Sequence, residues 1–263
     1  KPVIYSPAQN LVYINNQKAG CTSVKYSLWQ DADRRMGVQT FKGKTHDLSV
    51  SPFVHGYSAL KAALGQGDSA LAKAAVLTVV RNPFHRALSV YLHHVAAGGW
   101  WARLQRRFEI NRSQKLQHDF LRKAGLPPTS NLSFDAYLDA LEGVQQTRLT
   151  GHFRAQTLNT LWGDLAFDAV LRLEDSTAIT AFMASHGVDM QARVPHAQNA
   201  SDRHAEFFTP HAIAKVASIF ADDFAAFGYD PADPAAPAPS VVDAPIISPE
   251  GAQPLSALIE AAS

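Results

Sequence analysis

The sequence is poor in cysteine, in long apolar runs and in net charge. Its 263 residues include one cysteine, Cys21, so an internal disulfide cannot form and a disulfide-stapled fold is excluded. No apolar run reaches the roughly 18 residues that a membrane-spanning helix needs, and the N-terminal residues lack the layout of a secretory signal. The net charge of +1 gives no general attraction for nucleic acids, so local groups must bind any anion.

The chain has enough apolar sequence for one α/β domain. Hydrophobic residues make up 46% of it, and a core of this size needs no crosslinks. From Pro231 onward proline and alanine dominate. This shift predicts one domain over residues 1–230, followed by a partly disordered Pro/Ala-rich tail over residues 231–263.

Short apolar runs alternate with amphipathic stretches, as in proteins with a parallel sheet. Strands are predicted over residues 11–14, 75–80 and 167–173 and near 53–55. Helices are predicted from Thr22–Ser23 to Trp29, from Pro83 to Leu92, and over residues 59–64, 69–74, 134–141, 176–186 and 210–227. The basic, aromatic stretch 98–130 is interpreted as a surface insertion. These elements predict an α/β fold with a central parallel sheet flanked by helices.

The first candidate site is the loop between the strand at 11–14 and the helix after it. Its residues are Gln17, Lys18, Ala19, Gly20, Cys21, Thr22 and Ser23. A glycine loop entering a helix exposes backbone N–H groups, and the helix dipole adds partial positive charge, so phosphate is favoured there. Lys18 precedes Gly20, so this is not a Walker A motif, whose lysine follows the second glycine. An ordinary turn with a solvated lysine is the alternative.

The second candidate site is Arg81, at the end of the strand at 75–80, with Ser89 on the next helix. Ligands of open parallel sheets bind at the carboxyl ends of the strands. There the donor fork of an arginine and the hydroxyl of a serine can converge on one anion. The alternative is a surface ion pair for Arg81 and a hydroxyl bonded back to its own helix for Ser89.

Together the two elements resemble carbohydrate sulfotransferases that use PAPS (3'-phosphoadenosine 5'-phosphosulfate), namely the chondroitin-type Golgi family and its bacterial relatives. The segment from Lys18 to Ser23 resembles their 5'-phosphosulfate loop, and the segment from Arg81 to Ser89 resembles their 3'-phosphate motif in order and spacing. Further similarity lies at residues 151–156, 167–175 and 223–229. The resemblance covers about residues 3–230.

The resemblance implies a P-loop-like three-layer fold and transfer of a sulfuryl group from PAPS to a carbohydrate hydroxyl, as on a polysaccharide or glycolipid. PAP (adenosine 3',5'-bisphosphate) is the product, and no metal is required. Lys18 would neutralise the leaving phosphate, residues Gln17 to Ser23 would bind it, and Arg81 and Ser89 would bind the 3'-phosphate. Animal relatives act in the Golgi lumen, but one cysteine and no anchor favour a cytoplasmic, bacterial-like location for this stretch.

Histidines are the candidates for the general base, because imidazole titrates near neutral pH. His46 and His55 lie between the two phosphate motifs, and the residues leave the choice open. His152 and Gln156 are four positions apart, a spacing that would put them on one helix face, and the resemblance implies that they shape the acceptor or donor site. Each of the four has a purely structural alternative.

Two other function classes are alternatives to a sulfotransferase. A nucleotide kinase would need a lysine after the glycine and acidic magnesium ligands, and the sequence offers no convincing set of either. A non-catalytic nucleotide- or glycan-binding module would share the fold but lack turnover, and an assay separates it from an enzyme.

Overall fold

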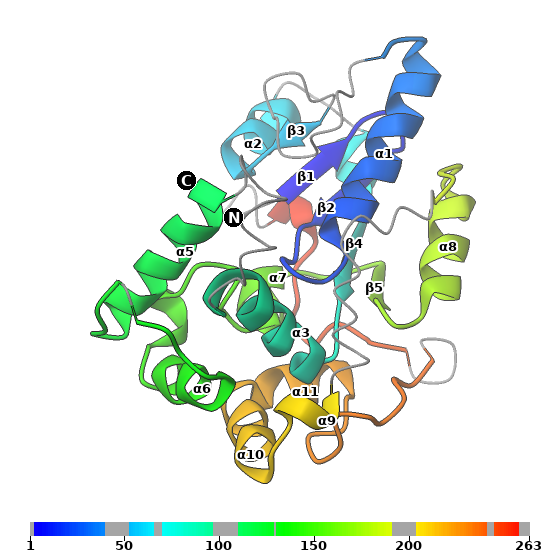
Figure 1. Ribbon diagram of the computed structural model, residues 1–263. Coiled ribbons are helices and arrows are strands. Elements are labelled where there is room, and N and C mark those ends of the chain that lie inside the picture. Colours follow the sequence, from blue (N-terminus) through cyan, green and yellow to red (C-terminus); the bar gives the residue numbers. More distant parts are fainter. Residues whose placement is uncertain are drawn as a thin grey trace. The chain divides into compact units, whose positions relative to one another are not determined.

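The structure is a computed structural model that describes residues 3–39, 53–65, 70–96, 110–128, 130–190, 204–240 and 245–257 (Figure 1). The chain forms two compact units. Unit 1 comprises Lys1–Arg81, Asn159–Pro195 and Ala238–Ser263, and unit 2 comprises Asn82–Leu158 and His196–Pro237. Across the described ranges, no helix has both the length and the apolar character needed to cross a membrane.

Unit 1 is built on a five-stranded sheet with the strand order β3-β1-β2-β4-β5. The strands are β1 (Val3–Ser6), β2 (Leu11–Ile14), β3 (Val54–His55), β4 (Ala75–Val80) and β5 (Ala169–Arg172). β2 pairs in parallel with β4, and β4 with β5, whereas β1 is antiparallel to both β2 and β3. All strands except β1 therefore point the same way, which confirms an α/β fold with a mostly parallel central sheet.

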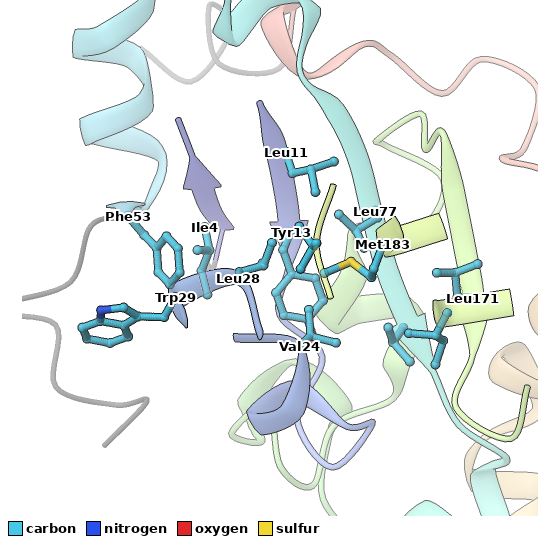
Figure 2. Packing of buried hydrophobic residues seen from close by; sticks show 13 residues of the cluster. Ile4, Leu11, Tyr13, Val24, Leu28, Trp29, Phe53, Leu77, Leu171 and Met183 are labelled. Atoms are coloured by element: carbon cyan, nitrogen blue, oxygen red, sulfur yellow. The ribbon is translucent and has the colours of Figure 1, made fainter. Parts of the chain in front are cut away.

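One face of the sheet is covered by α1 (Cys21–Met36) and α8 (Ser176–Ser185). Successive side chains of a strand point to opposite faces, and Leu11 and Tyr13 of β2 point to this one. They pack with Leu28 of α1 and Met183 of α8 in a fully buried cluster (Figure 2). The apolar residues whose spacing predicted α1 are therefore the ones that pack against the sheet.

The opposite face takes the alternate residues of the same strand, Val12 and Ile14. They cluster with Leu60 of α2 (Tyr57–Gly65) and Leu71 of the short 3-10 helix η2 (Leu71–Lys73). Leu255, from the tail, is buried in the same cluster. Layers on both faces of the sheet give unit 1 the expected three-layer build.

The described part of the tail makes further contacts with the rest of unit 1. Gln253 bridges Leu165 in parallel, and the Phe167 N–H donates to the Ser248 hydroxyl over 2.9 Å. Residues 245–257 are thus packed against the rest of unit 1, although their composition alone predicted little core.

Unit 2 is helical. Its helices include α3 (Pro83–Val90), the π-helical turn η3 (Tyr91–Val95), α5 (Ile110–Lys123), α6 (Phe134–Glu142), η4 (Gln146–Arg148), α9 (His204–Phe207), α10 (Pro210–Ile219) and α11 (Ala221–Phe227), and α7 (Gln156–Thr160) begins in it. Aromatic rings fill its core: the ring centroids of Phe84 and Phe224 lie 5.0 Å apart, and those of the stacked rings of Phe120 and Phe153 lie 4.8 Å apart. The helix predicted over 210–227 is two helices, α10 and α11, which meet at Phe220.

Candidate functional site

The loop after β2 holds Lys18 and Gly20 in left-handed backbone conformations. Their φ angles are 66° and 71°. Such angles suit glycine, because a Cβ atom strains the backbone there. At Gly20 a Cβ would also lie 2.6 Å from Leu173 Cδ1, just after β5. Glycine at position 20 therefore avoids backbone strain, and any Cβ there would force the Leu173 side chain to shift.

The N-terminus of α1 is open. Gly20 is the N-cap residue and no side chain caps the helix. The N–H groups of Ser23 and Val24 bond the Gly20 carbonyl oxygen at 3.0 and 3.3 Å. Within the described residues, the N–H groups of Cys21 and Thr22 meet no acceptor. These donors, the helix dipole and the Lys18 ammonium together favour an anion at this end of α1.

Asn16 fixes the loop to the neighbouring strand. Its side chain is fully buried, and its Nδ2 donates to the backbone oxygen of Val79 in β4 over 3.0 Å. The Thr78 hydroxyl donates to the Ile14 oxygen over 2.9 Å, one step earlier in the same pair of strands. The loop that carries Lys18 is therefore tied to the carboxyl end of β4.

Arg81 leaves the end of β4 and reaches the same loop. Its Nη1 donates to the backbone oxygen of Lys18 over 3.4 Å, although 63 positions separate the two residues in sequence. The fold of unit 1 thus brings together two of the cationic residues that the sequence singled out. It does so because β2 and β4 are parallel neighbours, so their carboxyl ends meet at one edge of the sheet.

Ser89, His152 and Gln156 belong to unit 2. Ser89 is buried on α3. Gln156 is fully buried and begins α7, while His152 lies in the turn before that helix, so the two share no helix face. The His152 ring lies 4.9 Å from the ring of His94 in η3. The roles assigned to Ser89, His152 and Gln156 stay predictions.

Of the two candidate bases, His55 ends β3 and is half-buried. Burial, and then the positive charge of Lys25, hold the pKa of the His55 imidazole below its usual value. The neutral form, which can accept a proton, is therefore favoured at neutral pH. His46 lies outside the described residues, so the choice between the two histidines stays open.

Asn16 and Lys25 were not predicted from the sequence as residues of the site. Both are buried polar residues, with 0% and 4% of their surface exposed. The position of Asn16 directly after an apolar strand, in the phosphate loop, was a usable signal, whereas Lys25 looks like any surface lysine of an amphipathic helix. In the described ranges, no three His, Cys, Asp or Glu side chains gather closely enough to hold a metal ion.

The comparisons with known proteins rest on one finding. A search of curated proteins and a search of solved structures each returned no match. A family model described as the sulfotransferase family matches residues 1–230, which is most of the chain. The match includes the loop of Lys18 and the segment from Arg81 to Ser89, and it implies a P-loop-like fold, in agreement with the layers of unit 1. The chain therefore belongs to the sulfotransferase family.

Proposed function

We propose that the chain transfers the sulfuryl group of PAPS to a hydroxyl group of a carbohydrate, releasing PAP. One observation carries the proposal: the uncapped N-terminus of α1 lies beside Lys18, whose backbone oxygen accepts a hydrogen bond from Arg81. Two cations and free backbone donors at one edge of the sheet suit a nucleotide with phosphate groups at two positions. Membership of the family adds the sulfuryl group as the one transferred.

The chemistry is an in-line displacement. The acceptor oxygen attacks sulfur, the bond between sulfur and the bridging oxygen of the 5'-phosphate breaks, and its electron pair leaves with PAP. Lys18 would neutralise the charge that grows on this phosphate, and the N–H groups of Cys21 and Thr22 would hold it. Arg81 and Ser89 would bind the 3'-phosphate. As in phosphoryl transfer, positioning and charge stabilisation supply most of the rate enhancement.

The proton of the acceptor hydroxyl goes to a histidine. His55 suits this role because its pKa is lowered, first by burial and then by Lys25, which leaves the ring nitrogen able to accept. His46 is the alternative base. His152 and Gln156 are proposed to shape the acceptor or donor site.

Sulfuryl transfer from radiolabelled PAPS to a panel of glycans tests the proposal. We expect the wild-type chain to label at least one glycan, and Lys18→Ala to lower kcat about 10²-fold or more, since it removes a charge that acts on the transition state. PAP binding should weaken only modestly. Lys61→Ala, on the exposed face of α2, is the matched control and should keep full turnover.

Two outcomes would contradict the proposal. Near-normal turnover of Lys18→Ala would remove the leaving-group role of Lys18. PAP binding by a wild-type chain that labels no glycan would favour the non-catalytic module, and transfer of the γ-phosphate of ATP would favour the kinase.

A further inference from the structure

Lys25 of α1 and His55 of β3 each lie next to one member of an aromatic pair within unit 1. Lys25 and Trp29 are four residues apart on α1 and so lie on one helix face. Phe53 and His55 are two residues apart along the extended chain at β3. The rings of Trp29 and Phe53 lie 5.7 Å apart (Figure 2), and those of Phe53 and His55 lie 6.1 Å apart. Lys25 is thus one helical turn nearer the phosphate loop than Trp29, on the side that faces β3.

Lys25 is buried, which is unusual for a charged side chain. Only 4% of its surface is exposed, and lysine is almost never buried to this extent without a compensating group. The positive charge of Lys25 acts on the His55 imidazole, and with burial it disfavours a second positive charge there.

In the part of the chain that the structure describes, the other elements around His55 bring little competing charge. The residue paired with His55 on β1 is Ile4, which is uncharged. On α2, Lys61 is exposed, and water screens it. Tyr26, next to Lys25 on α1, accepts a hydrogen bond from Gln30 at its hydroxyl over 2.7 Å. Among the described residues, Lys25 is the charged group that acts on His55.

We propose that Lys25 is the positioning residue of the candidate base: α1 holds its buried ammonium group opposite His55, where it keeps the imidazole uncharged and ready to accept the acceptor's proton. The catalytic meaning of this pair rests on the proposed function, whereas the pairing itself does not. The proposal assigns a use to a buried lysine one turn beyond the phosphate loop.

The pairing is tested by NMR titration of the His55 ring in the protein without nucleotide, with the resonance assigned by His55→Gln. Lys25→Met removes the charge and keeps the chain length, so we expect the pKa of His55 to rise. Lys25→Arg keeps the charge and should leave the pKa low. Lys61→Met is the matched control and should change nothing. If Lys25→Met fails to fold, Lys25→Gln provides the same reading. An unchanged pKa in the neutral variant overturns the proposal.

The catalytic meaning is tested by the pH dependence of kcat/KM. Activity should fall at low pH as His55 takes up a proton, and in Lys25→Met this fall should begin at higher pH, while Lys25→Arg restores the wild-type profile. An identical profile in Lys25→Met, despite a raised His55 pKa, overturns the role in catalysis. A wild-type chain without sulfuryl transfer defeats the proposed function instead, and the titration still decides on the pairing.

Discussion

Two helix N-termini of this protein are finished in opposite ways. At α7 in unit 2, the buried carboxylate of Asp223 accepts hydrogen bonds from the Gln156 and Thr157 N–H groups, each at 2.8 Å, and from the Thr157 hydroxyl at 3.0 Å. At α1 in unit 1, Gly20 takes the cap position and no side chain accepts from the helix. One end is closed by an anion of the chain itself, and the other is left open.

Two α-helices described with an N-cap residue, α1 and α11, lack a side-chain cap, but α11 follows directly from α10 at Phe220, whereas α1 follows a loop. Side chains cap four further helices: Asn82 at α3, Ser133 at α6, Asp175 at α8 and Thr209 at α10. A cap of this kind stabilises a helix by about 1 kcal/mol. A helix that lacks it, beside a lysine and an arginine, is suited to an anion that comes with the ligand.

Removal of the cap at the N-terminus of α7 should have the largest effect on stability. Asp223→Ala removes three hydrogen bonds at α7 and leaves Arg86, which is electrostatically coupled to Asp223, without that negative charge. We expect a loss of about 3 kcal/mol in the free energy of unfolding, measured by urea denaturation. Asp222→Ala, at the exposed neighbouring position, is the control and should cost little. Equal losses in unfolding free energy for the two variants would show that the Asp223 cap does not stabilise the protein.

The open end should be damaged by a single methyl group. Gly20→Ala adds a Cβ to a left-handed residue and places it 2.6 Å from Leu173 Cδ1, so we expect a loss of about 2 kcal/mol in unfolding free energy and weaker PAP binding. Gly37→Ala, at the other end of α1, is the matched control because its φ is 64° but nothing lies within 4 Å of the added atom. It should cost about 1 kcal/mol and leave PAP binding intact.

Leu173→Ala provides an internal check on this explanation. In the double variant with Gly20→Ala the clash is gone, so part of the lost stability should return. If it does not, the close approach of Leu173 is not the reason for the glycine.

The role of Arg81 beside the open end can be tested by comparing PAP and AMP, which share the 5'-phosphate and differ only in the 3'-phosphate. Arg81→Ala should raise the Kd for PAP about tenfold or more, since a charge-assisted hydrogen bond is lost, and should change the Kd for AMP much less. Isothermal titration of both nucleotides provides the measurement. Equal losses for PAP and AMP would refute the assignment of Arg81 to the 3'-phosphate.

The sequence predicted the parts of the fold whose signal is local. β2 and β4 are short apolar runs, and the glycine and lysine between β2 and α1 stand in one segment. β1 was missed, although Val3–Ser6 is equally apolar. It reverses into β2 at the turn of Pro7–Asn10, where Asn10 has a φ of 51°. The two strands form an antiparallel hairpin, whereas the sequence pattern predicted a parallel sheet.

The candidate site was predicted only as far as its motifs extend. Lys18 and Arg81 could be named because their neighbours in sequence are diagnostic. Asn16 and Lys25 could not be given roles, because what distinguishes them is burial, and burial depends on residues far away in the chain. The contact between Lys18 and Arg81 likewise depends on the pairing of β2 with β4.

Leu255 has a consequence for anyone who shortens this protein. The family match stops at residue 230, yet Leu255 packs in the hydrophobic cluster that contains Val12 and Leu165. The backbone of Gln253 forms a parallel bridge with that of Leu165. A variant truncated at residue 230 would lose Leu255 from this cluster and expose part of the apolar surface that Leu255 covers. Residues 245–257 are therefore part of the folded structure of unit 1, and a shortened variant should keep them.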